Sequence, residues 1–187
     1  GYICSNENGE TSNLGRGGSD YSAAIYAKYV NAKVLEIWTD VSGVFSANPK
    51  IVKKASPIEF LSYKEAMELS FFGAKVIYFP TLQPLIEDNI PVFIKNTFDP
   101  SAEGTCISNS TKLDNDEIVK GISHIENISI LNFEGSGMVG VPGFSKRFFE
   151  ALSSNQINVV MITQASSEFS ICIAINSNDA QLAKQVI

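Results

Sequence analysis

Asn13-Leu14-Gly15-Arg16-Gly17-Gly18-Ser19-Asp20 is a glycine-rich loop that leads directly into a run of helix-forming residues. Its glycines let the backbone turn sharply and bring N–H groups close to a ligand. Residues 21–30 predict a helix, with Ser19 as its N-cap, and a glycine loop that enters a helix N-terminus favours an anion. Arg16 can bind a carboxylate and Asp20 an ammonium group, so the loop is a candidate site for a zwitterion. The alternative is an ordinary glycine turn with a charged cap.

Strand-like and helix-like segments alternate from the N-terminus to about residue 107. We expect, in chain order, a strand at 1–5, a helix at 21–30, a strand at 33–39, helices at 63–72 and 81–88, and a strand at 91–95. Ser62 and Glu65 have the spacing of a capping box at the start of the second helix. This alternation is typical of an α/β layered fold with a largely parallel sheet.

A second pattern begins after the polar, turn-rich residues 99–117, and we place a linker at 108–123. Beyond it we expect a strand at 128–133, a helix at 144–152, strands at 157–163 and 169–175, and a helix at 179–186. The order β-α-β-β-α is that of a ferredoxin-like α+β domain without its last strand. The predicted domains are therefore 1–107 and 124–187.

Composition excludes several classes of protein. The net charge of −6, with no basic stripe, argues against a nucleic-acid partner. No apolar run is long enough to span a bilayer, so no membrane association is expected. Three widely spaced cysteines and a single histidine predict neither a disulfide framework nor a protein metal site, and buried thiols in a cytoplasmic protein fit better. The first residues lack an initiator methionine and a signal-peptide pattern, so we expect a fragment of a longer protein.

The motif at residues 38–45, Trp-Thr-Asp-Val-Ser-Gly-Val-Phe, follows an apolar strand. Ligands of open α/β sheets bind outside the carboxyl ends of strands. Thr39 and Asp40 can therefore bond a nucleotide or its metal, and Phe45 can pack against a base. Asp40 can equally cap the turn at residues 42–43.

A lysine follows a helix-ending glycine in the motif at residues 72–77, Phe-Gly-Ala-Lys-Val-Ile. Lys75 can reach phosphate groups as a point charge. A solvated surface lysine is the alternative.

These motifs occur together in one order: LGRGGSDYSAA, WTDVSGVF, SYKEAMELSFFGAKV and IPVFIKNT, continued by VKGIS and VVMITQASSEFSI. In this order they closely resemble the aspartokinases of the amino-acid kinase family, and the last two are most similar to bifunctional aspartokinase–homoserine dehydrogenases. The resemblance implies that residues 1–107 form the C-terminal part of a parallel-sheet α/β amino-acid kinase domain. It also implies that residues 124–187 are an incomplete ferredoxin-like (ACT) regulatory domain.

The implied reaction is phosphoryl transfer from ATP, with Mg, to the β-carboxylate of L-aspartate. By the resemblance, Arg16 would bind the α-carboxylate of aspartate and Asp20 its ammonium group, with Ser19 assisting. The implied nucleotide residues are Thr39, Asp40, Phe45, Lys50 and Lys75, the last at the phosphates.

The resemblance further implies a homo-oligomer that binds an amino-acid effector, threonine rather than lysine. Ile162 and Gln164 are the expected effector contacts, and backbone amides of the glycine-rich loop 135–143 can bind the effector carboxylate. The alternative for Gln164 is a simple hairpin turn with residues 166–167.

Several positions depart from the family pattern. Asn48-Pro49-Lys50 replaces the usual Asp-Pro-Arg, Phe45 replaces a common tyrosine and Tyr78 a common histidine. The Lys-Phe-Gly-Gly phosphate loop is absent, so we expect residues 1–187 alone to be inactive. Two alternatives stay open: another amino-acid kinase for glutamate or uridylate, disfavoured by the RGGSD loop and the ACT-like tail, and a non-catalytic amino-acid-sensing or oligomerisation module.

Overall fold

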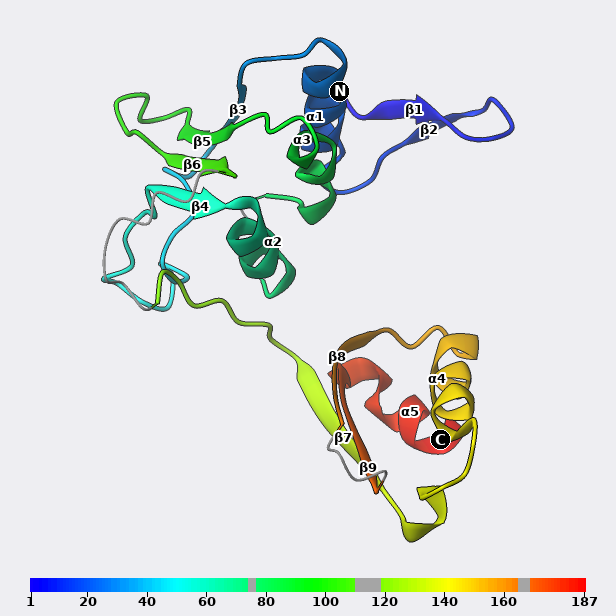
Figure 1. Ribbon diagram of the computed structural model, residues 1–187. Helices are drawn as coiled ribbons and strands as arrows, with labels where there is room; N and C mark the ends of the chain where they lie inside the picture. Colours follow the sequence, from blue (N-terminus) through cyan, green and yellow to red (C-terminus); the bar gives the residue numbers. More distant parts are fainter. Residues whose placement is uncertain (74–76, 110–118, 165–168) are drawn as a thin grey trace. The chain divides into compact units, whose positions relative to one another are not determined.

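The computed structural model describes residues 1–73, 77–109, 119–164 and 169–187 and divides into two compact units, Gly1–His124 and Ile125–Ile187 (Figure 1). Across these described ranges no helix has both the length and the apolar character needed to cross a bilayer. The predicted linker at 108–123 stays a prediction, because most of it lies outside the described residues.

The first unit contains a four-stranded sheet of order β3-β5-β6-β4. Its strands are β3 (Leu35–Thr39), β4 (Phe60–Ser62), β5 (Val92–Asn96) and β6 (Thr105–Ser108). The pairs β3/β5 and β4/β6 are parallel, as expected, whereas β5/β6 is antiparallel, so the predicted parallel pairing is present in part and the sheet is mixed. Only residues 97–104 join β5 to β6, too few for the crossover that parallel pairing requires.

The predicted first strand does not belong to this sheet. Residues Ile3–Ser5 form β1, which pairs antiparallel with β2 (Thr11–Asn13) in a separate two-stranded hairpin. Asn6 Oδ1 accepts hydrogen bonds from the N–H groups of Asn8 and Glu10, at 3.0 and 2.9 Å. This side chain stabilises the tight reversal between the two strands.

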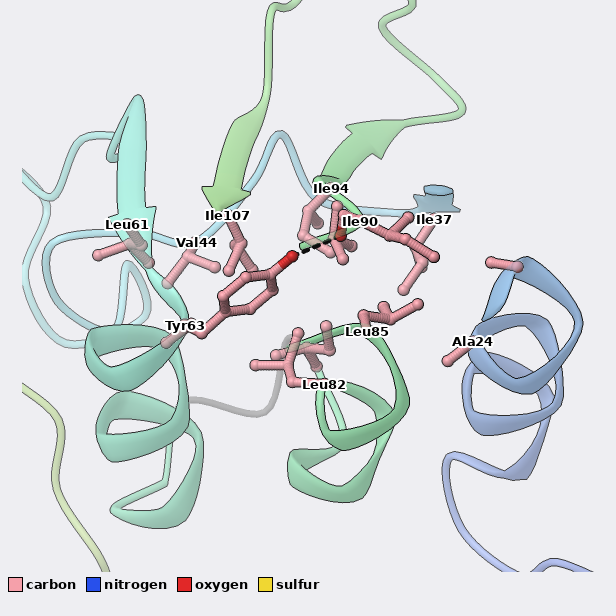
Figure 2. Packing of buried hydrophobic residues seen from close by; sticks show 14 residues of the cluster. Ala24, Ile37, Val44, Leu61, Tyr63, Leu82, Leu85, Ile90, Ile94 and Ile107 are labelled. Atoms are coloured by element: carbon pink, nitrogen blue, oxygen red, sulfur yellow. Dashed lines mark hydrogen bonds between the residues drawn. The ribbon is translucent and has the colours of Figure 1, made fainter. Parts of the chain in front are cut away.

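Helices cover one face of the sheet (Figure 2). They are α1 (Gly18–Tyr29), α2 (Tyr63–Phe71), the 3₁₀ turn η1 (Phe79–Thr81) and α3 (Gln83–Ile86). Figure 2 shows strand residues such as Ile94 pointing toward Leu82 and Leu85, and all three are fully buried. The predicted helix 81–88 is interrupted, because Pro84 has no N–H and is accommodated in the first turn of a new helix.

The capping box predicted at the start of α2 is present. Ser62 Oγ accepts the N–H of Glu65 at 3.1 Å, and Glu65 Oε2 accepts the N–H of Ser62 at 2.7 Å. The next residue, Tyr63, is buried, and its hydroxyl donates to the backbone carbonyl of Ile90. The capping box closes the start of α2, and the Tyr63 bond ties α2 to the segment that precedes β5.

The strand β3 is buried on one face only, whereas a fully buried strand was expected. Ile37 faces the helices, but Trp38 is 45% exposed on the opposite face. There Lys95 Nζ lies 3.1 Å from Glu36 Oε1 and 5.4 Å from the Trp38 ring centroid. Charge pairing thus replaces apolar packing on this face.

The second unit has the predicted order β-α-β-β-α of a ferredoxin-like domain. Its elements are β7 (Ile128–Glu134), η2 (Ser136–Met138), α4 (Phe144–Ser154), β8 (Val159–Gln164), β9 (Ser170–Asn176), η3 (Ser177–Asp179) and α5 (Ala180–Val186). The sheet is antiparallel, of order β7-β9-β8. The predicted apolar face of α4 contacts the core through Phe144, Phe148 and Leu152.

Candidate active site

The glycine loop makes a left-handed turn immediately before α1. Gly15 N–H donates to Asn13 Oδ1 at 2.9 Å, and Gly18 N–H donates to the carbonyl of Gly15 at 3.1 Å. Gly17, at φ 70°, is the N-cap and makes no side-chain cap hydrogen bond. The prediction of Ser19 as N-cap is therefore wrong, because the left-handed turn ends at Gly17 and places Ser19 inside the first helical turn. The N–H groups of Gly15 and Gly18 are thus used within the turn, and no side chain caps the start of α1, a position that favours an anionic ligand.

Two charges of opposite sign accompany these amides. Arg16 is exposed in the turn, and Asp20 is half-buried in the first turn of α1. Burial raises the pKa of Asp20 above its ordinary value, although the Ser19 hydroxyl, which donates to Asp20 Oδ1 at 3.4 Å, partly opposes that effect. A half-buried carboxylate of this kind gains from a bound cation, which compensates the lost hydration.

Polar side chains also gather at the carboxyl ends of β3 and β5. Thr39 and Asn96 are paired in these parallel strands and so lie at the same edge. Thr39 Oγ1 donates to Oδ1 of the exposed Asp40 at 3.2 Å. Asn96 Nδ2 donates to Ser42 Oγ at 2.8 Å, which ties the turn after β3 to the end of β5.

Asn96 is a residue that the sequence analysis did not single out. Its signal is the polar ending of the strand motif IPVFIKNT. From the sequence, Asp40 is a candidate cap for the turn that contains Ser42. Ser42 instead accepts a hydrogen bond from Asn96, and Asp40 accepts one from the Thr39 hydroxyl.

The remaining predicted nucleotide residues are less tightly placed. Phe45 is half-buried and forms an isolated antiparallel bridge with Pro57. Lys50 is exposed, and its N–H donates to Asn48 Oδ1 at 3.0 Å. Lys75 lies outside the described residues.

The glycine loop and the β3 edge face the same end of the unit. Only residues 30–34 connect α1 to β3, so the helix must run antiparallel to the strand, as Figure 1 shows. The N-terminal turn of α1, with Ser19 and Asp20, therefore points to the end where β3 finishes at Thr39. A glycine turn at a helix start and a polar strand edge at one end suit a reaction between two bound ligands.

Metal-binding side chains are sparse in the parts of the chain that the structure describes, where no group of three or more His, Cys, Asp or Glu residues could hold an ion. The cysteines Cys4, Cys106 and Cys172 are thiols, and they are half-buried rather than buried as expected. The exposed Asp40 fits Mg²⁺, because this ion is usually bound through one or two carboxylates together with substrate phosphates.

The predicted effector residues lie in the second unit. Ile162 and Gln164 occupy the edge strand β8, where they pair with Ile173 and Ile171. Two positions apart, they share one face of the strand, and Ile162 is 54% exposed. Residues 166–167 lie outside the described part of the chain.

The loop 135–143 includes η2 and ends in Gly143, which is the N-cap of α4 at φ 79° and makes no side-chain cap hydrogen bond. The amides at the start of α4 thus resemble those of the glycine loop before α1.

Comparison with known proteins gives a separate family match for each of two parts of the chain. Residues 1–96 match the model of the amino acid kinase family, and residues 131–187 match an ACT domain. The bifunctional aspartokinase/homoserine dehydrogenase of Haemophilus influenzae is 48% identical over 187 residues, 100% of this chain and 23% of that protein. This chain therefore spans about a quarter of that relative's length.

Two crystal structures of Escherichia coli aspartokinase III are also similar. The complex with aspartate and ADP (R-state) has a TM-score of 0.80 and 36% identity, over 94% of this chain and 38% of that one. The complex with lysine and aspartate (T-state) has a TM-score of 0.71 and 33% identity, over 95% and 39%.

Proposed function

We propose, from the premise that this chain belongs to the amino acid kinase family, that it is part of a regulated aspartate kinase. The reaction is transfer of the γ-phosphoryl group of MgATP to the β-carboxylate of L-aspartate. The observation that carries the proposal is the glycine loop, whose uncapped helix start, exposed Arg16 and half-buried Asp20 suit an α-amino acid. The similar E. coli enzyme was solved with aspartate and ADP, which supports this choice of ligands.

The aspartate substrate is a zwitterion with an additional carboxylate. Arg16 binds its α-carboxylate through charge-assisted hydrogen bonds, assisted by Ser19 and the loop amides. Asp20 binds its ammonium group, and that cation favours the ionised form of a carboxyl whose pKa burial has raised. Recognition of both charges leaves the β-carboxylate of the substrate as the nucleophile.

The nucleotide occupies the edge formed by β3 and β5. Thr39 and Asp40 bond the nucleotide or its Mg²⁺, Phe45 packs against the base, and Lys50 and Lys75 supply positive charge to the phosphates. Bound Mg²⁺ would neutralise charge on the phosphates of the nucleotide. Phosphoryl transfer asks little covalent chemistry of the protein, so alignment of two anions and electrostatic stabilisation provide most of the catalysis.

The decisive experiment is a coupled assay of ADP release by the whole polypeptide that carries this sequence, with L-aspartate, L-glutamate and UMP as acceptors. Release that depends on aspartate supports the proposal, and Arg16→Met should raise KM for aspartate far more than KM for MgATP. Release that depends only on glutamate or UMP would instead establish another amino acid kinase.

The second candidate function is a non-catalytic amino-acid-sensing or oligomerisation module, a reading favoured by the match of residues 131–187 to an ACT domain. We expect these residues alone to release no appreciable ADP. Normal turnover by residues 1–187 would contradict that expectation.

Regulation is proposed to act through the ACT domain in a cytoplasmic homo-oligomer. Ile162, Gln164 and the amides of loop 135–143 would bind the effector, which we propose to be threonine. The T-state structure of the E. coli enzyme contains lysine, so both amino acids must be titrated. Heat of binding with lysine and none with threonine would reject the threonine assignment.

A further inference from the structure

The hydroxyl group of Thr105, at the start of β6, lies between two backbone segments beyond the end of β3. Thr105 Oγ1 accepts the N–H of Val44 at 2.8 Å and donates to the carbonyl of Ile58 at 2.6 Å. The N–H of Ile58 donates directly to the carbonyl of Val44 at 2.8 Å. In a regular antiparallel pair the reciprocal bond would join Val44 N–H to the Ile58 carbonyl. The Thr105 hydroxyl replaces that bond with a two-step connection.

This connection is buried and closely packed. Thr105 is 0% exposed and Val44 is 3% exposed. Gly43 has φ 114°, and a Cβ placed on it would lie 2.4 Å from Thr105 Oγ1, so the hydroxyl approaches this closely only because residue 43 has no side chain. Without the hydroxyl, the buried Val44 N–H and the half-buried Ile58 carbonyl would lose their partner, and leaving a buried donor unsatisfied costs free energy.

The segment held in this way carries the proposed nucleotide contacts. Asp40 precedes it, and Phe45 follows Val44 directly and bridges to Pro57, the neighbour of Ile58. The other side of the turn is held where Asn96 donates to Ser42. The position of the Phe45 backbone relative to β3 therefore depends on the hydrogen bonds of Thr105.

We propose that Thr105 is a positioning residue for the nucleotide, acting through the Val44–Phe45 backbone without touching the ligand. This inference rests on the proposed kinase function, which places the nucleotide at the edge of β3. It predicts that loss of the hydroxyl weakens nucleotide binding selectively, while aspartate binding at the glycine loop is unchanged.

The test uses the whole polypeptide and three substitutions. Thr105→Val keeps the shape of the side chain and removes the hydroxyl, whereas Thr105→Ser keeps the hydroxyl. The matched control is Thr81→Val, because Thr81 is also 0% exposed and, among the described residues, its Oγ1 has no hydrogen-bond partner. The readouts are calorimetric titration with MgADP and separate KM values for MgATP and aspartate.

We expect Thr105→Val to weaken MgADP binding and to raise KM for MgATP about tenfold, the size of effect typical of one lost interaction. KM for aspartate should stay within about twofold of the parent, since the two hydrogen bonds of the Thr105 hydroxyl join Val44 and Ile58 and involve no residue of the glycine loop. Thr105→Ser and Thr81→Val should resemble the parent. If Thr105→Val does not fold, Thr105→Cys, with a thiol that is a weak donor and acceptor, should show intermediate MgADP affinity.

Unchanged MgADP affinity in Thr105→Val or Thr105→Cys overturns the inference, as does an equal rise in both KM values or a Thr105→Ser variant as weak as Thr105→Val. A parent that binds MgADP but phosphorylates no aspartate rejects the proposed function instead, and the MgADP titration still decides the role of Thr105. A parent that does not bind MgADP rejects both.

Discussion

Gly17 of the glycine loop and Tyr78 are in direct contact, although they are 61 positions apart in the sequence. A Cβ placed on Gly17 would lie 2.4 Å from Tyr78 Cβ and 2.5 Å from its Cγ. Gly17 also has φ 70°, a conformation that L side chains rarely adopt. Tyr78 thus packs against the loop that carries Arg16 and Asp20.

We predict that Gly17→Ala destabilises the protein and raises KM for aspartate, because the loop cannot keep both its left-handed turn and its contact with Tyr78. Gly15→Ala is the matched control: Gly15 has φ 73°, but a Cβ there meets nothing within 4 Å. Denaturant unfolding should show a loss of about 1–2 kcal/mol for Gly15→Ala, the cost of a left-handed L-residue, and a larger loss for Gly17→Ala. Equal losses in the two variants would show that the Tyr78 contact contributes nothing.

The ionised Asp20 side chain should lower the free energy of unfolding when no substrate is bound. Its pKa in the folded protein is raised above 3.8 by burial, so the protonated form favours folding. That contribution is complete below pH 3.8 and is lost as the pH rises through the folded-state pKa. The N-terminal end of α1 favours the charged form, so the net effect is small.

We therefore predict that Asp20→Asn slightly stabilises the substrate-free protein at pH 7, and that the difference from the parent disappears on acidification to below pH 3.8. The same variant should lose aspartate affinity, since the amide cannot balance an ammonium group. Chemical denaturation across this pH range and aspartate titration at pH 7 test both parts. An Asp20→Asn variant that is less stable than the parent at pH 7 would refute the stability argument.

The parts of the fold predicted correctly are those in which local signals and packing agree. The capping box at Ser62 and Glu65 is read directly from residue types at fixed spacing, and the apolar face of residues 144–152 identifies the core side of α4. The three missed strands, β2, β4 and β6, have no such signal. Residues 11–13 are all exposed, 60–62 form only a three-residue segment, and 105–108 are few and follow a polar stretch, so only pairing with a neighbour makes them strands.

The residues of the candidate site also fall into two groups, those indicated by the sequence and those found only in the structure. Arg16, Asp20 and Asp40 stand out in the sequence because they are charged residues beside a glycine turn or at a strand end, where the backbone can approach a ligand. Asn96 and Thr105 act through partners 54 and 61 positions away, Ser42 and Val44 respectively. Such pairs follow from the register of β5 and β6, which the sequence pattern does not specify.

The cap of α2 predicts sensitivity to acid. Burial tends to raise the pKa of Glu65, but its hydrogen bonds from the Ser62 backbone, Lys120 and the Ser62 hydroxyl outweigh burial and lower the pKa below 4.5. Its contribution to stability is present above pH 4.5 and is lost as the pH falls through the folded-state value. We predict that Glu65→Gln lowers the free energy of unfolding at pH 7 and flattens its dependence on pH below 4.5.

Glu68→Gln, at an exposed position on the same helix, serves as the control and should retain the parent's acid transition. Ser62→Ala should cost about 1 kcal/mol through loss of the N-cap. An unchanged acid transition in Glu65→Gln would mean that other carboxylates govern unfolding at low pH.

Tyr63 allows a test of one buried hydrogen bond in the core of the first unit. Its ring is 3% exposed, its hydroxyl donates to the Ile90 carbonyl, and burial raises its pKa to about 12 (Figure 2). Tyr63→Phe keeps the ring but leaves that carbonyl without its donor, so we expect a loss of about 1–3 kcal/mol in the free energy of unfolding. Tyr29→Phe, at a site that is 81% exposed, should change it by less than about 0.5 kcal/mol. Ile90 precedes β5, and Asn96 at the end of β5 holds the turn after β3. A Tyr63→Phe variant with the parent's stability would therefore show that this hydrogen bond does not help to fix β5, the strand that supports the site.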